Sequence, residues 1–215
     1  PPREAPILVV DRPGSVQGSI RLAGPAVDRA DPGYASLAGA TAAFGGYFAS
    51  RLWANLRERR GYTYSPSAGV TQRRSASHLV VGADVATEVV GPALLEIRYE
   101  LGRMAESMVE ESELGDAVRY LGGSLALSWQ TQAGLATQLS ALSAFGLGIE
   151  FLRDMPDALG RLSRDDVLDA ARRWLAPRRL TTVIVGEAEA IRTQVEALDD
   201  VEVAAVAGSA ADGVR

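Results

Sequence analysis

The stretch that decides the fold runs from Phe44 to Gly69. It reads Phe-Gly-Gly-Tyr-Phe-Ala-Ser-Arg-Leu-Trp-Ala-Asn-Leu-Arg-Glu-Arg-Arg-Gly-Tyr-Thr-Tyr-Ser-Pro-Ser-Ala-Gly. The pair Gly45-Gly46 ends a helix predicted over residues 34–44, and Ser50 is placed to cap a second helix, predicted over residues 51–60. Gly61 fits the left-handed position that follows a helix end. The stretch therefore predicts two helices separated by a glycine turn, and then a reversal of the chain into a strand.

Strand signals lie on both sides of this stretch. They are apolar alternation and β-branched runs bounded by turn residues. Residues 7–11 and 15–23 are expected as two strands around a Pro-Gly turn, residues 62–71 and 77–85 as a hairpin, and residues 180–186 as a buried strand.

Helical periodicity fills most of the remaining chain. A long helix beginning near Thr87 or Gly91 carries an apolar stripe. The stripe comprises Leu94, Ile97, Leu101, Met104 and Met108. Further helices are predicted over residues 113–128, 133–145 and 151–162. Another helix begins at a capping box at Ser163 and ends by Pro177, and a last one is predicted around residues 191–198.

This order of elements predicts an α+β fold, a mostly antiparallel sheet with helices packed on one face. We expect a linker over residues 1–6, a single domain over residues 7–200 and a loose C-terminal tail over residues 201–215.

The composition excludes several classes of function. The chain has 215 residues with one histidine, His78, no cysteine and a net charge of −5. These counts exclude a zinc site built from His and Cys, thiol chemistry and iron–sulfur clusters, and a Ser-His-Asp triad would have to use His78. Because the charge is acidic and no basic stripe appears, we expect no nucleic-acid partner.

No apolar run reaches the roughly 18 residues of a membrane span, so we expect no membrane partner. The N-terminal residues lack the apolar core of a signal peptide, which suggests a cytoplasmic location but leaves the compartment open.

The central stretch resembles the pitrilysin/insulinase family of zinc metallopeptidases, which includes the mitochondrial processing peptidase. The matching positions are Gly45-Gly46, Ser50-Arg51-Leu52, Leu56-Arg57-Glu58, Arg60-Gly61 and Tyr64. Weaker similarity extends over residues 11–17, 121–124, 134–136, 162–177 and 183–186.

The resemblance implies that this chain is the zinc-free half, the C-terminal half, of such a peptidase. The inverted His-x-x-Glu-His motif of the zinc half is absent from the sequence. The chain is then expected to bind no cofactor itself and to work with a zinc-bearing domain or subunit on a peptide substrate. A homodimer is a further expectation.

The same resemblance assigns substrate binding to Arg57 and Tyr64, with Gly45 and Gly46 as a glycine-rich segment that touches substrate. A guanidinium and a phenol are hydrogen-bond donors suited to a peptide carbonyl or to the oxyanion of a tetrahedral intermediate. Two alternatives stay open at this point: a purely structural or assembly module of the same fold, and a free-standing peptide-binding protein.

Overall fold

The computed structural model describes residues 7–73 and 76–205. These residues form a six-stranded sheet with the strand order β3-β4-β2-β5-β1-β6. The strands are β1 (Ile7–Asp11), β2 (Gln17–Ala26), β3 (Ser67–Thr71), β4 (Ser77–Ala86), β5 (Thr181–Gly186) and β6 (Val201–Ala205). The pairs β3–β4, β4–β2 and β2–β5 are antiparallel, whereas β1 runs parallel to both β5 and β6. The predicted α+β class, with a mostly antiparallel sheet, is confirmed.

Helices occupy the rest of the described chain. They are α1 (Tyr34–Thr41), α2 (Arg51–Trp53), α3 (Val90–Glu106), α4 (Glu111–Ser128), α5 (Gln132–Ala144), α6 (Ile149–Gly160), α7 (Arg164–Ala170) and α8 (Ala188–Val195). Wider π-type turns continue three of them: η1 (Ala42–Gly46) follows α1, η2 (Ala54–Arg59) follows α2, and η4 (Ala171–Leu175) follows α7. Short 3₁₀ turns, η3 (Thr87–Val89) and η5 (Pro177–Arg179), complete the set.

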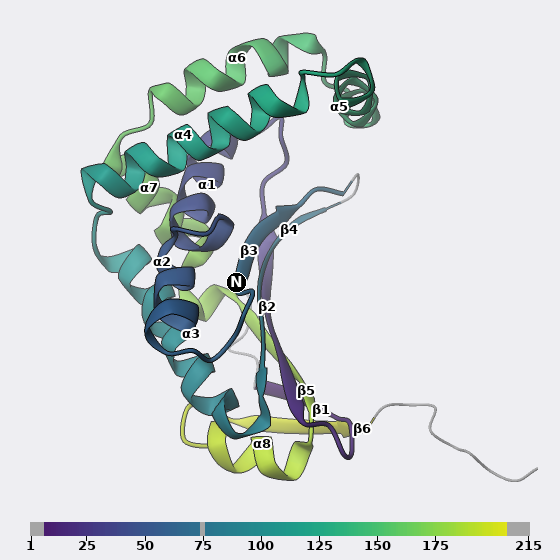
Figure 1. Ribbon diagram of the computed structural model, residues 1–215, viewed down its shortest axis with the longest axis vertical. Coiled ribbons are helices and arrows are strands. Elements are labelled where there is room, and N and C mark those ends of the chain that lie inside the picture. The colour runs from purple at the N-terminus through teal and green to yellow at the C-terminus, as the bar shows by residue number, and fades with distance from the viewer. Residues whose placement is uncertain (1–6, 74–75, 206–215) are drawn as a thin grey trace, which may run out of the picture.

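The helices cover one face of the sheet. Figure 1 shows the sheet nearly edge-on, with α1, α2, α3 and α7 along one side, α4 to α6 at one end and α8 at the other. Ile20 of β2 and Val81 of β4 are buried on the covered face, and Leu94 and Ile97 of α3 are buried against that core. Because the strands alternate in this way, the sheet needs helices on one face only.

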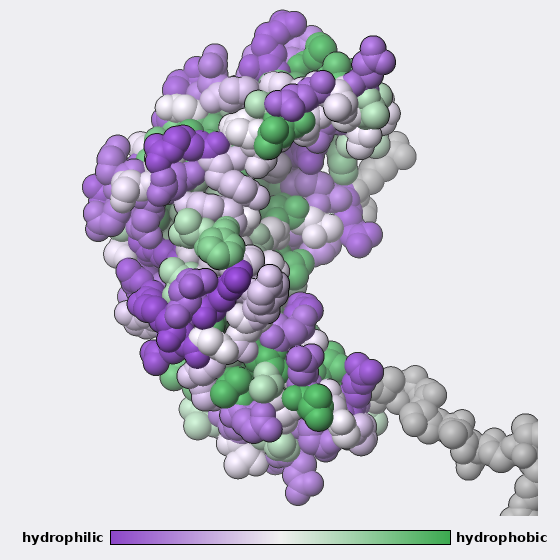
Figure 2. All heavy atoms as spheres, viewed as in Figure 1, coloured by the Kyte–Doolittle hydropathy of each residue, from purple (hydrophilic) through white to green (hydrophobic). Residues whose placement is uncertain are grey.

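The opposite face of the sheet carries polar groups among half-buried apolar ones. Arg21 of β2 and Asp84 of β4 form an ion pair of 2.9 Å there, and the hydroxyl of Ser19 donates to Asp84 over 2.7 Å. In Figure 2 the outline is hollowed on the side of this uncovered face, and apolar side chains appear only in small separate groups.

Three predicted elements differ in the structure. β1 and β2 do not form a hairpin, because β5 lies between them and pairs with both. The strand predicted over residues 62–71 is confined to Ser67–Thr71, since Pro66 has no N–H for a ladder and Tyr62 instead closes the preceding helix end. α3 ends at Glu106, so Met108 lies beyond the helix and is 40% exposed, outside the predicted stripe.

The predicted loose tail over residues 201–215 is also wrong in its first part. Residues Val201–Ala205 form β6, which pairs along all of β1. Without β6, the N–H and C=O groups on one side of β1 would be unpaired at the sheet edge. Pairing with β6 gives these groups hydrogen-bond partners. Residues 1–6 and 206–215, predicted as a linker and the rest of the tail, lie outside the described residues.

The capping box at Ser163 is confirmed. The Ser163 hydroxyl accepts from the Asp166 amide, and the Asp166 carboxylate accepts from the Ser163 amide. The Ser163 hydroxyl also donates to the Asp166 carboxylate over 2.6 Å, and this bond, followed by the bond from the Ser163 amide, lowers the pKa of Asp166. Asp therefore serves in the third position of the box, where Glu is more usual.

None of the described helices is by itself long and apolar enough to cross a membrane. α5 and α6 together meet that criterion of length and composition, but they are bent by 98° at their junction.

Candidate functional site

Arg57 and Tyr64 lie in contact. Arg57 is in η2 and Tyr64 is in the loop before β3. The Cζ atom of Arg57 is 4.5 Å from the ring centroid of Tyr64, 4.7 Å from that of Phe48 and 5.3 Å from that of Trp53. We call Phe48, Trp53 and Tyr64 the aromatic cage. The guanidinium is thus held by cation–π contacts with three rings.

The cage leaves Arg57 and Tyr64 accessible. The side chain of Arg57 is 26% exposed and Tyr64 is 77% exposed. Among the described residues, the ion-pair partner of Arg57 is its neighbour Glu58, at 3.4 Å. Cation–π contacts do not use up the five N–H donors of a guanidinium, so Arg57 keeps donors for a ligand.

The end of the helix at Gly61 brings the two residues together. Gly61 has φ +66, its amide donates to the carbonyl of Arg57 over 3.1 Å, and the Tyr62 amide donates to the carbonyl of Leu56 over 2.8 Å. The bond from the Gly61 amide to the Arg57 carbonyl is the 5→1 bond of the αL motif, with glycine in the left-handed position that the sequence predicted. The motif reverses the chain, and Tyr64 then returns to the Arg57 side chain.

The two glycines occupy different environments. Gly45 is buried, and a Cβ atom there would lie 2.9 Å from the Cβ of Ala68 on β3 and 3.2 Å from Leu52. Gly45 therefore allows η1 to pack closely against β3. Gly46 is partly accessible and lines a cavity of about 190 Å³ beside β3.

Ser50 stands at the predicted N-cap of α2 but does not cap with its side chain. Its hydroxyl donates to the Tyr47 carbonyl over 2.6 Å instead. This bond closes the loop between η1 and α2, the loop that carries Phe48.

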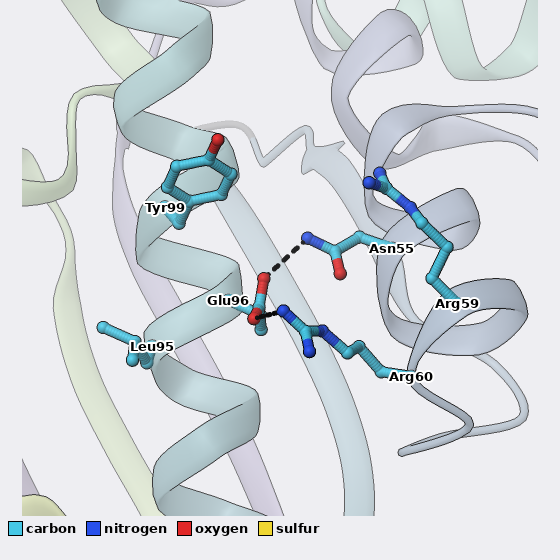
Figure 3. A pocket seen from close by; sticks show the side chains of 6 residues that line it. All are labelled: Asn55, Arg59, Arg60, Leu95, Glu96 and Tyr99. Atoms are coloured by element: carbon cyan, nitrogen blue, oxygen red, sulfur yellow. Dashed lines mark hydrogen bonds and ion pairs between the residues drawn. The ribbon is translucent and has the colours of Figure 1, made fainter.

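A second set of contacts fixes η2 on α3. The side-chain nitrogen Nδ2 of Asn55 donates to the carboxylate of Glu96 over 2.9 Å and to that of Glu100 over 2.8 Å. Figure 3 shows Asn55 and Arg60 pointing toward Glu96, with which Arg60 forms an ion pair. We call Asn55, Glu96 and Glu100 the carboxylate clamp. Asn55 and Glu96 of the clamp border a cavity of about 540 Å³, to which Arg59, Arg60, Leu95 and Tyr99 also contribute.

Glu100 of the clamp is fully buried and is surrounded by hydrogen-bond donors. Its second carboxylate oxygen accepts from Arg103 over 2.9 Å, and Arg59 lies 3.8 Å from the first. A buried carboxylate needs such partners. Since Asn55 lies two residues before Arg57, the clamp holds the backbone that carries the guanidinium.

Sequence reasoning missed the clamp and the cage. Asn55 follows the apolar spacing of Leu52 and Leu56, and Glu100 falls next to the stripe of Ile97 and Leu101. Polar residues at core positions of two predicted helices are a signal for a buried pair.

An ion pair fixes the start of α2 on α4. Arg51, which is 7% exposed, donates to both carboxylate oxygens of Glu113 over 2.7 and 2.8 Å. The hydrogen bond from Arg51 lowers the pKa of Glu113, and the same bond raises the pKa of Arg51. The loop with Phe48 is therefore anchored at both ends.

His78 lies on β4 and is half-buried, and it is not part of the cage or the clamp. Within residues 7–73 and 76–205, no group of three or more His, Cys, Asp or Glu side chains is placed to hold a metal ion.

Comparison with known proteins gives related sequences and folds. The chain is 27% identical over 168 residues to an uncharacterized zinc protease of Streptomyces coelicolor. The alignment covers 78% of this chain and 37% of that protein. A peptidase M16 inactive domain from Pseudomonas fluorescens superposes with a TM-score of 0.76 at 27% identity, covering 86% of this chain and 45% of that one. This chain thus spans less than half the length of either relative.

The fold alone is shared with a chain of Complex III2 from Candida albicans. That match has a TM-score of 0.71 at 15% identity and covers 90% of this chain and 49% of the other.

The sequence profile described as the peptidase M16 inactive domain matches residues 1–121, more than half of the chain. That match includes the whole stretch from Phe44 to Gly69, so the resemblance seen in this stretch is confirmed. The chain belongs to the family of peptidase M16 inactive domains.

Proposed function

We propose that this chain is the zinc-free half of a two-part metallopeptidase and binds the peptide substrate through Arg57 and Tyr64. The observation that carries the proposal is the contact between the Arg57 guanidinium and the Tyr64 ring, 4.5 Å from Cζ to centroid. The two donors come from different elements, yet their side chains meet on an accessible surface.

The chemistry of the pair suits a peptide carbonyl. The guanidinium offers N–H groups in one plane, and the phenol offers an O–H beside it. Donors fixed before the reaction stabilise negative charge as it develops on the carbonyl oxygen, and they do not need to reorganise at that moment. The cage and the clamp provide this fixation, the first at the guanidinium and the second at the backbone.

The partner in this proposal is a zinc-bearing domain or subunit. When bound there, zinc supplies an activated water. The family membership and the relatives, both longer than this chain, support such a partner. In this proposal residues 7–205 act as one inactive domain, with Gly45 shaping the loop and Gly46 facing the substrate side.

The test is substitution of the pair in the assembled enzyme. Arg57→Ala is expected to lower kcat/KM for peptides by about 10²–10³, the usual loss for one oxyanion donor, and Tyr64→Phe to lower it as well. Arg153→Ala, at an exposed arginine on α6, is the matched control. Unchanged turnover in Arg57→Ala and Tyr64→Phe would favour a structural or assembly module instead.

A further inference from the structure

A cavity of about 410 Å³ lies where two loops meet the end of a helix. The loop between β2 and α1 contributes Asp28, Arg29 and Ala30, and the turn after β3 contributes Arg73. The rest of the lining is residues 143–147, at the end of α5 and in the loop that follows it. In Figure 1, β3 and β4 extend toward α5. The cavity therefore brings together two arginines from different parts of the sequence.

These two arginines have donors to spare. Neither Arg29 nor Arg73 forms an ion pair with a carboxylate of residues 7–73 and 76–205. The Nε atom of Arg29 is buried and has no hydrogen-bond partner within those residues. Buried donors in proteins are nearly always paired, because an unpaired one destabilises the fold. A ligand that accepts from Arg29 removes this cost.

The carboxylates closest to Arg29 in the sequence are already engaged. Asp28 accepts from the Ala30 amide over 2.9 Å, and Asp31 accepts from the Gly33 amide over 2.7 Å. Such bonds hold an aspartate within its own turn. The loop therefore keeps its carboxylates turned to its backbone and leaves the guanidinium of Arg29 for another acceptor.

An aromatic pair supports Arg29. Its Cζ atom lies 6.0 Å from the ring centroid of Phe151 on α6, and that ring packs against Tyr34 of α1 at 5.9 Å. A cation–π contact orients a guanidinium but leaves its N–H groups free to donate. Arg29 is therefore positioned before any ligand binds.

The opposite wall of the cavity is fixed by the end of α5. Gly146 has φ +71, its amide donates to the Ser143 carbonyl over 3.0 Å, and the Leu147 amide donates to the Leu142 carbonyl over 3.0 Å. These two bonds make a Schellman motif. Because the motif sets the backbone of this turn, the cavity has an apolar wall, made by Phe145 and Leu147, that is formed without an occupant.

Charge and volume indicate the class of ligand. Arg29 and Arg73 with Asp28 give the lining one net positive charge, which matches the single negative charge of a carboxylate. A phosphate group carries about 1.5 to 2 negative charges at pH 7, and the excess would lie beside Asp28. Sites for small molecules measure about 300–1,000 Å³, so the cavity also has room for an apolar group next to the carboxylate.

We propose that this cavity binds a carboxylate carried next to a small apolar group, as in the C-terminal residue of a peptide or in a free acylated amino acid. Arg29 and Arg73 donate to the carboxylate, and the wall of Phe145 and Leu147 contacts the apolar group. Arg57 and Tyr64 do not line this cavity, so the inference does not depend on the proposed function.

The test is calorimetric titration of the full 215-residue chain with N-acetylleucine and with its amide, N-acetylleucinamide. The acid is expected to bind at least about 10-fold more tightly, because the neutral amide cannot form charge-assisted bonds with the arginines. Arg29→Gln is expected to weaken binding of the acid by roughly 10- to 100-fold. Arg178→Gln, at an exposed arginine of η5 outside the lining, is the matched control and keeps the affinity.

A second variant keeps the test independent of the folding of Arg29→Gln. Ala144→Trp fills the cavity and leaves both arginines in place, and it is expected to weaken binding of N-acetylleucine to a similar extent. Thermal unfolding of each variant identifies those that are folded. A peptide with a C-terminal leucine carboxylate that binds more tightly than N-acetylleucine identifies a peptide end as the ligand, and equal affinity identifies a free acid.

Three results overturn the proposal. The first is equal affinity for the acid and the amide, and the second is unchanged affinity for the acid in the folded variants. The third is inorganic phosphate binding more tightly than N-acetylleucine and losing its affinity in Arg29→Gln, which would make the cavity a phosphate site.

Discussion

At Arg57, aromatic rings rather than a buried carboxylate hold the guanidinium. The nearest carboxylate, that of Glu58, is 57% exposed, and an exposed pair of this kind contributes little. The cage orients the charge without neutralising it. A guanidinium held in this way keeps its full charge for a substrate.

Because Phe48 belongs to the cage, its substitution should lower activity with little effect on stability. Its ring centroid lies 4.7 Å from Cζ of Arg57. Phe48→Ala removes one cation–π contact, about 0.5–2 kcal/mol, and frees the guanidinium to move. We expect kcat/KM for peptides to fall by roughly 2- to 30-fold, measured with the zinc-bearing partner present. The Tm should change little, because Phe48 is 57% exposed.

Tyr99→Ala is the matched control for this prediction. Tyr99 is also 57% exposed and lies 5.8 Å from an arginine, Arg103, but it is on α3 outside the cage. A loss of activity in Tyr99→Ala equal to that in Phe48→Ala would contradict the role of the cage.

Sequence reasoning reached only part of this site. Arg57 and Tyr64 could be selected because their seven-residue spacing falls in a stretch that resembles a known family. Phe48 and Trp53 could not, because an aromatic residue on a predicted helix or loop is equally consistent with packing in the core. Trp53 lies one helical turn before Arg57, whereas Phe48 reaches Arg57 only through the path of the loop between η1 and α2.

Among the elements, α2 is short and depends on its contacts with other helices. It has three residues before the wider turn η2 begins. The Arg51–Glu113 pair joins it to α4, and the carboxylate clamp joins η2 to α3. Helix propensity alone does not stabilise so short a segment, so these polar contacts set its position.

The Arg51–Glu113 pair predicts a pH dependence of stability. Because the pKa of Glu113 is lowered in the folded chain, the pair stabilises the fold above the usual carboxyl value of 4.5, and this stabilisation is lost as pH falls through the lowered pKa. Glu113→Gln should cost about 1–2 kcal/mol at pH 7, since the carboxylate is partly exposed. The measurement is Tm of both proteins from pH 7 to pH 3, and the difference should vanish at the acid end.

Glu111→Gln provides the control, because Glu111 is exposed in the same first turn of α4 and shares its dipole interaction. A difference between wild type and Glu113→Gln that stays constant down to pH 3 would rule out the ionic origin of the effect.

Features that depend on residues a few positions apart could be predicted from the sequence. Strand pairings between distant segments could not. The capping box at Ser163 and the stripe from Leu94 to Met104 depend on residues a few positions apart. The insertion of β5 between β1 and β2 depends on segments separated by most of the chain, and adjacency in sequence favoured the wrong pairing. β6 was missed because its pattern of Val and Ala is short and its partner lies at the other end of the sequence.

At the scale of the whole molecule, the described helices cover one face of the sheet only, and the chain spans less than half the length of the relatives compared above. The candidate residues lie at the covered side and edge of the sheet, where a second domain can reach them. In the proposed two-part enzyme, Arg57 and Tyr64 bind the substrate and the partner would supply the zinc and its activated water.

The isolated chain is therefore expected to show no peptide hydrolysis, with or without added zinc. Activity should appear only when the zinc-bearing domain is added, and a chelator should remove it. Release of product by the isolated chain, purified free of its partner and assayed by mass spectrometry, would contradict the two-part arrangement.

The position of β1 between β5 and β6 has a consequence for folding. β1 is synthesised before the other strands of this sheet, yet both strands that flank it come from the last part of the described residues. Such a sheet has high contact order, and closing so long a loop slows folding. The apolar segment Ile7–Val10 therefore stays unpaired until β5 and β6 have been synthesised, and an unpaired apolar strand of this kind is prone to aggregate.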